Sequence, residues 1–261
     1  MKTKHIRSNN NSPGTGRDHP LTLVNFSQPT ILDRFLKSAN QTSSFLLDRS
    51  LPITDVLVGE TSSTYGGGTA NTSASFAAGF MWLDKLGLAA VLNQSYVCRQ
   101  TFAEARYSII GADGALNPDY WTSILFRQLI GTRVLSVRNG LDLGRTFRTY
   151  AFCSSRDKEI VVVYLNTNDV ETTSNLTLVS HNQILSLKTY VLTSEPGNLA
   201  SRDVYLNGNL LRLADDMKAT LPDLDSMAET HHNTSIFVAP PKSYGYIAIS
   251  LDDSNGSICF L

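Results

Sequence analysis

The hydrophobic pattern of the chain changes near Gly131, and this change limits the folds open to it. Before Gly131, apolar residues recur at helical spacing in segments that alternate with two short apolar runs, at residues 53–59 and 94–102. Helices that alternate with buried strands are typical of βα units, whose strands lie parallel. After Gly131 the chain contains short β-rich runs separated by turn signals such as Asn207-Gly208. These runs predict an antiparallel β-sandwich.

The same patterns predict where the helices and strands lie. The first helix begins near Pro29, the second follows Ser73 as its expected N-cap, and the third begins at Asn117-Pro118. Because two parallel strands can neither close a barrel nor bury both sheet faces, we expect the missing strands upstream or in another chain. The predicted strands beyond Gly131 are residues 134–137, 146–153, 160–165, 176–179, 185–192, 204–206, 210–213, 236–238 and 244–251.

The composition excludes some classes of partner. The 261 residues are 42% hydrophobic and 17% charged, which suits a globular chain with a buried core. A formal net charge of −1 gives the whole chain no attraction to nucleic acid or to anionic membranes. Five arginines are close together in the sequence, and we favour solvated strand and loop positions for them over a rim that attracts a polyanion. They are Arg127, Arg133, Arg138, Arg145 and Arg148.

Several features bear on the membrane and on secretion. The most apolar stretch, residues 76–92, is interrupted by Asp84 and Lys85 and is too short to span a bilayer, so we expect no transmembrane segment. The N-terminus is charged but has no apolar core of a signal peptide. Repeated Asn-x-Ser/Thr acceptors nevertheless favour a glycosylated protein. They lie at Asn10, Asn25, Asn40, Asn71, Asn93, Asn175, Asn233 and Asn255.

The three cysteines and five histidines show no metal-binding spacing, so we expect no metal and no cofactor. An odd number of cysteines predicts one disulfide and one free thiol. Cys98 lies in an apolar run and is expected to be the free, buried thiol, while Cys153 and Cys259 could pair in an oxidising compartment. The His231-His232 pair lies among polar residues and is expected in a surface loop.

A carboxylate, Glu60, follows the first apolar run directly. The run has the length and the Val, Ile and Leu content of a buried strand, and the carboxyl ends of parallel strands are where α/β folds keep their catalytic groups. Gly66, Gly67 and Gly68 come next, and their lack of a Cβ would let a bulky ligand approach the backbone. On spacing alone, a strand that ends in a solvated turn explains the same residues equally well.

Longer motifs connect the chain to a known family. Two segments closely resemble the heparanase family: Gly59-Glu-Thr-Ser-Ser-Thr-Tyr-Gly-Gly-Gly68 and Phe76-Ala-Ala-Gly-Phe-Met-Trp-Leu-Asp-Lys-Leu-Gly-Leu88. Further matches follow at Arg99-Gln100, at residues 117–121 and 204–208, and at Cys259, so the resemblance covers roughly residue 24 to the end. It implies a retaining endo-β-glucuronidase of glycoside hydrolase family 79 that cleaves heparan sulfate chains.

The resemblance also implies a fold of the class α/β plus all-β. Residues 24–132 would hold strands 7 and 8 of an incomplete (β/α)8 TIM barrel, and residues 133–261 would form the antiparallel β-sandwich. Residues 1–23 match nothing in the family and are expected to be disordered. The implied partners are heparan sulfate or heparin and an N-terminal chain or segment that completes the barrel. The implied location is secreted, in the extracellular matrix, or lysosomal.

By resemblance, Glu60 is the nucleophile at the end of the seventh barrel strand. Retaining glycosidases need a second carboxyl group about 5–5.5 Å away, which protonates the leaving oxygen. For Gln100 and Tyr107, packing at a strand end is the alternative to substrate binding. The resemblance also pairs Cys153 with Cys259. The implied substrate-binding residues are Tyr65, Gly66, Gly67, Gln100 and Tyr107.

One part of the family's pattern is not found in these residues. The family's proton donor is a Glu in an Asn-Glu-Pro segment at the fourth strand, far upstream, and the nearby carboxylate Glu104 is expected to be a surface residue. We therefore expect the chain alone to be inactive. The alternative is a non-catalytic module that binds heparan sulfate or promotes secretion. The intact Gly-Glu-Thr-Ser-Ser pattern, which is disrupted in catalytically dead relatives, argues against that alternative.

Overall fold

The computed structural model describes residues 5–8, 22–48, 55–64, 66–156, 158–179, 182–214, 220–252 and 259. The chain divides into two compact units, each of which is described by itself. The first unit is Met1–Tyr120 with Leu141–Arg145, and the second unit is Trp121–Gly140 with Thr146–Leu261. The predicted boundary near Thr132 lies within the second unit, and the domain limits themselves stay a prediction.

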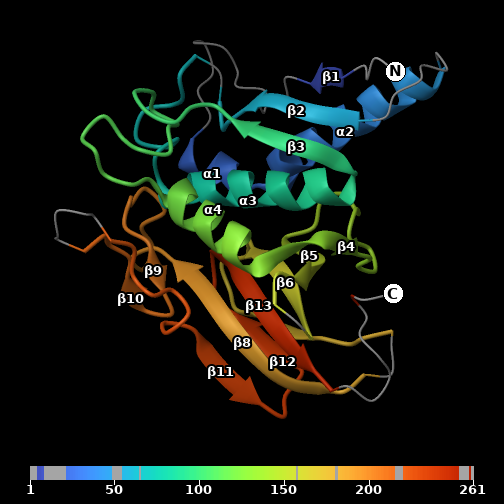
Figure 1. The fold of residues 1–261 in the computed structure, drawn as a ribbon. Helices are drawn as coiled ribbons and strands as arrows, with labels where there is room; N and C mark the ends of the chain where they lie inside the picture. Colours follow the sequence, from blue (N-terminus) through green and yellow to red (C-terminus); the bar gives the residue numbers. More distant parts are fainter. Residues whose placement is uncertain are drawn as a thin grey trace. The chain divides into compact units, whose positions relative to one another are not determined.

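The first unit contains a sheet of three parallel strands in the order β1-β2-β3 (Figure 1). Helix α3 connects β2 to β3, so these three elements form the βαβ unit that the sequence predicts. The strands are β1 (His5–Ser8), β2 (Asp55–Thr61) and β3 (Gln94–Arg99), and the helices are α1 (Leu23–Phe26), α2 (Pro29–Asp48), α3 (Phe76–Val91) and the first residues of α4 (Pro118–Leu129).

Two of the predicted helix starts are confirmed and one is wrong. Helices α2 and α4 begin at Pro29 and Pro118, where the missing N–H of proline costs a helix nothing. Helix α3 begins after Ser75 instead of Ser73, because the Ser73 hydroxyl serves the preceding loop. The Ser73 hydroxyl accepts hydrogen bonds from Ser63 Oγ at 2.8 Å and from the Thr69 N–H at 2.9 Å. Helix α3 is also buried on almost every side instead of along one stripe.

The prediction of disorder for residues 1–23 is wrong in two places. His5–Ser8 form β1, because the edge of β2 offers their backbone a parallel partner. Leu23 begins α1, which ends at Phe26 with that side chain fully buried. The rest of residues 1–21 lies outside the described residues.

The prediction of a buried strand at residues 94–102 is corrected as well. Strand β3 ends at Arg99, and it is an edge strand of the described sheet with several exposed side chains. Tyr96 is 66% exposed. Cys98 is a free thiol, as predicted, but it is exposed and not buried.

In the second unit, an antiparallel sheet of eight strands is the main feature (Figure 1). Its order is β10-β9-β8-β13-β6-β5-β4, with β11 paired to β8, and the separate pair β12-β7 forms a second sheet. The strands are β4 (Ile130–Leu135), β5 (Phe147–Ser154), β6 (Glu159–Asn166), β7 (Thr172–Asn175), β8 (Ile184–Thr193), β9 (Tyr205–Leu206), β10 (Asn209–Leu210), β11 (Glu229–His232), β12 (Ile236–Ala239) and β13 (Ser243–Leu251).

Apolar side chains cover both faces of the eight-stranded sheet. On one face the ring of Tyr164 lies 4.8 Å from that of Phe237 in β12, within a buried cluster that joins the two sheets. On the other face α4 packs against the sheet: the rings of Phe126 and Phe152 are 5.7 Å apart. The Tyr246 hydroxyl also donates a hydrogen bond to a backbone carbonyl of α4 at 2.6 Å. The core of this unit therefore has the sheet at its centre.

Three predictions for this half of the chain are corrected. Strand β7 is Thr172–Asn175 and not residues 176–179, because its pairing with β12 ends at Asn175. The His231-His232 pair lies in β11, where β8 supplies its backbone partner, and not in a loop. Arg148 is only 3% exposed, because it shares the covered face of β5 with Phe152. The other predicted strands overlap observed ones.

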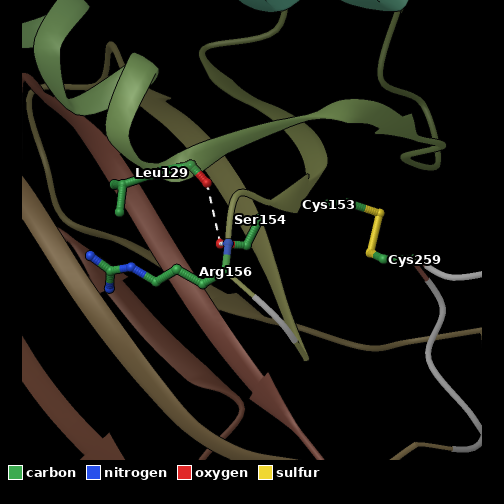
Figure 2. Close-up of a disulfide and its surroundings, with 5 residues drawn as sticks. All are labelled: Leu129, Cys153, Ser154, Arg156 and Cys259. Atoms are coloured by element: carbon green, nitrogen blue, oxygen red, sulfur yellow. Dashed lines mark hydrogen bonds between the residues drawn. A yellow bond between two sulfur atoms is a disulfide. The ribbon is translucent and has the colours of Figure 1, made fainter.

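A disulfide joins Cys153 in β5 to Cys259 near the end of the chain (Figure 2). The two Cα atoms are 5.6 Å apart, although 106 residues separate them in sequence. Next to Cys153, the Ser154 hydroxyl donates a hydrogen bond to the Leu129 carbonyl at 3.3 Å, which links β5 to the end of α4. The pairing that the resemblance implies is therefore present.

Candidate active site at the carboxyl edge of the parallel sheet

Glu60 lies near the carboxyl end of β2 and is partly exposed. Because β2 and β3 are parallel, their carboxyl ends meet at the same edge of the sheet. The register pairs Thr61 with Arg99, and the Gln100 N–H donates a hydrogen bond to the Thr61 carbonyl at 2.9 Å. Glu60 and Gln100, which were predicted from separate parts of the sequence, therefore share this edge.

The glycine loop that follows β2 has the conformation that requires glycine. Gly66, Gly67 and Gly68 have φ angles of 69°, 85° and 99°, a backbone region that other residues rarely adopt. A Cβ added at Gly66 or Gly67 would meet no atom within 4 Å, so both face open space. A Cβ at Gly68 would lie 3.0 Å from the backbone nitrogen of Tyr107, so Gly68 is a packing position. Tyr65 lies outside the described residues.

The segment after β3 holds the glycine loop. The Arg106 N–H donates a hydrogen bond to the Gly67 carbonyl at 2.9 Å, and the Arg106 guanidinium reaches the Gly68 carbonyl at 3.4 Å. Tyr107, the next residue, is 5% exposed. The two loops that follow β2 and β3 are thus joined directly, and they bring Gly67 and Tyr107 to the edge that carries Glu60.

Tyr107 is electrostatically coupled to Glu60. Burial raises the pKa of the Tyr107 phenol, and the negative charge of Glu60 raises it further, while Arg99 acts in the opposite direction. The phenol therefore keeps its proton and can donate a hydrogen bond toward the carboxylate side of the site. The burial of Tyr107 agrees with packing near the end of β3, and its contact with substrate stays a prediction.

A buried charged cluster underlies this edge, and the sequence interpretation did not identify it. Lys85 in α3 is 2% exposed, and its ammonium group donates hydrogen bonds to Thr61 Oγ1 at 2.8 Å and to the Ser62 carbonyl. Arg99 forms an ion pair with Asp119 at 2.6 Å. The sequence signal for this cluster is the occurrence of Asp84 and Lys85 inside an otherwise apolar helix.

Arg99 links the cluster to the rest of the site. Its guanidinium lies 4.7 Å from the centroid of the Trp82 ring and donates a hydrogen bond to the Tyr107 carbonyl. Burial lowers the pKa of Arg99 and raises that of Asp119, and the ion pair between them opposes both shifts. Burial also lowers the pKa of Lys85 to about 7, in the same direction as the nearby charge of Arg99.

The described part of the first unit does not supply an evident second catalytic carboxylate beside Glu60. Glu104 is exposed and has a φ of 75°, in agreement with its prediction as a surface residue. Asp119 forms an ion pair with Arg99. Among the described residues, no cluster of His, Cys, Asp and Glu is suited to a metal ion. Within the same residues, no helix combines the length and the apolar character needed to cross a bilayer.

Comparison with known proteins identifies the relatives of the chain. No family model matches it. Heparanase of Bos taurus is 36% identical over 237 residues, which are 87% of this chain and 42% of that protein. Heparanase of Gallus gallus is 36% identical over 236 residues, 87% of this chain and 44% of that protein. The chain is a heparanase homologue.

Other relatives differ in their named activity. A hyaluronoglucuronidase of Hirudo nipponia is 33% identical over 213 residues, 77% of this chain and 41% of that protein. Inactive heparanase-2 of Mus musculus is 30% identical over 203 residues, 71% of this chain and 33% of that protein. This heparanase homologue thus spans less than half the length of the curated relatives it matches.

Solved structures with a similar fold are glycoside hydrolases. A 4-O-α-L-rhamnosyl-β-D-glucuronidase from Fusarium oxysporum matches with a TM-score of 0.62 at 15% identity, over 92% of this chain and 52% of that chain. A GH51 arabinofuranosidase from Xanthomonas axonopodis pv. citri matches with a TM-score of 0.57 at 9% identity, over 94% of this chain and 52% of that chain. At these identities the likeness concerns the fold alone. The homologue is thus similar to heparanases in sequence and to glycoside hydrolases in fold.

Proposed function

We propose that the protein containing this chain is a retaining endo-β-glucuronidase that cleaves heparan sulfate, with Glu60 as the nucleophile. The observation that carries the proposal is the position of Glu60 at the carboxyl edge of the parallel sheet, beside an open glycine loop and the phenol of Tyr107. Catalytic carboxylates of α/β glycosidases occupy this edge. The homology to heparanases supports the choice of substrate class.

In the proposed mechanism, the Glu60 carboxylate attacks the anomeric carbon of a glucuronic acid unit and forms a covalent glycosyl-enzyme. A second carboxyl group, about 5–5.5 Å from the first, protonates the leaving oxygen and later activates the water that hydrolyses the intermediate. That acid comes from a segment outside these 261 residues, so the chain alone does not complete the reaction. In this mechanism the Tyr107 phenol, which keeps its proton, orients the Glu60 carboxylate.

Substrate binding in this proposal uses the two joined loops. Gly66 and Gly67 face open space, and the Gly67 carbonyl already accepts a hydrogen bond from Arg106. The sugar therefore approaches the glycine backbone from the side where a Cβ would otherwise stand. Gln100 contributes its amide from the end of β3, and Tyr65, which lies outside the described residues, remains a predicted substrate-binding residue.

The proposal includes the architecture and the location of the whole protein. The parallel strands are strands of an incomplete (β/α)8 barrel, and the second unit is a β-sandwich. An N-terminal chain or segment completes the barrel against the open edge of β3, where Tyr96 and Phe102 are 66% and 70% exposed. The protein is a secreted or lysosomal glycoprotein, and its disulfide suits an oxidising compartment.

The test of Glu60 uses the longer protein that includes the acid-bearing segment. We expect this protein to generate new reducing ends from heparan sulfate, the Glu60→Gln variant to show no cleavage, and the Glu104→Gln variant to retain full activity. Glu60→Ala supplied with azide and an activated aryl glucuronide should form a glucuronyl azide of inverted configuration, because azide replaces the missing nucleophile on the same face. Robust cleavage by Glu60→Gln would refute the assignment.

A second candidate function is a non-catalytic module that binds heparan sulfate or promotes secretion, and the homology to inactive heparanase-2 is the observation that favours it. Retention on a heparin column that falls with rising salt, in a longer protein that cleaves nothing, would support this function. The net charge of −1 predicts weak retention of the chain itself.

A further inference from the structure

We infer that Lys85 is a positioning residue that fixes the backbone immediately after Glu60 and thereby the direction of the Glu60 carboxylate. The inference rests on the proposed function, in which Glu60 is the nucleophile. Lys85 lies on α3, one element away from the reacting edge, and acts only through Thr61 and Ser62.

The burial of Lys85 calls for an explanation. Lys85 is only 2% exposed, and it lies in a helix whose other side chains are mostly apolar. Lysine is almost never fully buried unless it is paired, since removing an ammonium group from water is costly. A helix in contact with the sheet could use leucine or methionine at this position more cheaply. The lysine must therefore make interactions that an apolar side chain cannot make.

Those interactions are directed at the two residues after Glu60. The Lys85 ammonium donates one hydrogen bond to Thr61 Oγ1 at 2.8 Å and another to the Ser62 carbonyl. Thr61 and Ser62 are 0% and 2% exposed, so water cannot replace these donors. On the opposite side, the Thr61 carbonyl accepts the Gln100 N–H at 2.9 Å. The strand end is thus held from α3 and from β3 together.

The charged groups around Lys85 act on it in opposite directions, and one of them, Arg99, also contacts Tyr107. Asp119 and Asp84 favour its charged form, while Arg99 disfavours it. Arg99 in turn pairs with Asp119 and donates a hydrogen bond to the Tyr107 carbonyl. Lys85 therefore holds the backbone beside Glu60, and Arg99 holds the backbone of Tyr107. Glu60 and Tyr107 face each other in the proposed mechanism.

The expected consequence is kinetic. Displacement of a reacting group by about 1 Å lowers a rate on the order of 10²-fold. Removal of the Lys85 ammonium leaves the Thr61 hydroxyl and the Ser62 carbonyl buried without this donor, so the strand end shifts. Attack by Glu60 should slow, while the loop residues that contact the sugar keep KM nearly unchanged.

The experiment compares Lys85→Met with Lys37→Met, a matched change at an exposed lysine of α2, in the longer protein. Intact sites are counted by trapping with a 2-fluoro-glucuronide that forms a stable glycosyl-enzyme. We expect kcat per trapped site to fall about 10²-fold in Lys85→Met and to stay at the parent value in Lys37→Met. A purely structural role would lower the number of trapped sites but leave kcat per site unchanged, and that result would overturn the inference.

A second variant covers the case in which Lys85→Met does not fold. Thr61→Val keeps the shape of the side chain and removes only the hydroxyl that Lys85 contacts. It should lower kcat per trapped site in the same direction by a smaller factor. Where the double variant folds, its loss should be less than the product of the two single losses, because both changes remove one interaction. An unchanged kcat in Thr61→Val would count against the inference.

A measurement on the 261-residue chain separates this inference from the proposed function, because it needs no activity. Hydrogen exchange at the amides of residues 62–64 should be about tenfold faster in Lys85→Met than in Lys37→Met, the factor expected for loss of a buried hydrogen bond. If the longer protein cleaves nothing but this exchange still accelerates, the proposed function fails and the positioning contact stands. Equal exchange in the two variants overturns the positioning contact.

Discussion

Three residues of the candidate site depend on the fold to different degrees. Glu60 is recognisable because it ends an apolar run and begins a family motif. Lys85 lies inside such a motif but has no local signature, since only the fold brings it beneath Thr61. Tyr107 is intermediate: the resemblance names it, but its burial and its coupling to Glu60 depend on the loop after β3. Residues that are far apart in the sequence but interact in the fold can be recognised only from the structure.

Lys85 should also make the stability of the first unit depend on pH. Burial lowers its pKa to about 7, whereas an unfolded lysine titrates near 10.4. Between these values the unfolded state binds more protons, so the Lys85 contribution to the free energy of unfolding rises with pH, by at most about 1.4 kcal/mol per unit. Below pH 7 both states are protonated and the contribution is constant.

Urea unfolding of the parent chain and of Lys85→Met at pH 7 and pH 9 measures this effect. The parent should gain stability relative to the variant between the two pH values, by an amount on the order of 2 kcal/mol. Lys37→Met, at an exposed position, should follow the parent. A difference between parent and Lys85→Met that is the same at both pH values would contradict the lowered pKa.

At the scale of helices and strands, the sequence predicts elements whose apolar residues are regularly spaced. Helices α2 and α4 and strands β5, β6, β8 and β13 are of this kind, because one or both of their faces enter a core. Strands β7 and β11 have the polar sequences Thr-Thr-Ser-Asn and Glu-Thr-His-His, and they exist because β12 and β8 offer partners. Pairing between distant segments leaves no periodic signal, so these strands were misplaced or missed.

The disulfide should contribute strongly to the stability of the second unit. Cys153 and Cys259 close a loop of 106 residues, and removing such a bridge costs about 2–5 kcal/mol. We expect Cys259→Ser to lower the Tm of the second unit by several degrees in calorimetry. Cys98→Ser is the matched control, since Cys98 is exposed and free, and it should leave the Tm unchanged. Equal Tm values for Cys259→Ser and the parent would show that the bridge does not support the fold.

At the scale of the whole molecule, the two units differ in how completely their sheets are covered. In the second unit, α4 covers one face of the eight-stranded sheet and the β12-β7 pair covers the other. In the first unit, the described sheet has three strands, and β3 leaves Tyr96 exposed at its outer edge. A parallel sheet normally has both faces covered and its neighbours in place. We therefore expect the second unit to be the more stable of the two on its own.

Limited proteolysis of the 261-residue chain tests this difference. Cleavage requires local opening, which is cheaper where fewer apolar contacts must break. We expect the first unit to be degraded first, and a fragment that contains β5 to β13 and the Cys153–Cys259 bridge to persist. Reducing the bridge before proteolysis should shorten the life of this fragment. A persistent fragment that instead contains β2, α3 and β3, with the second unit lost, would show that the parallel sheet is stable without further strands.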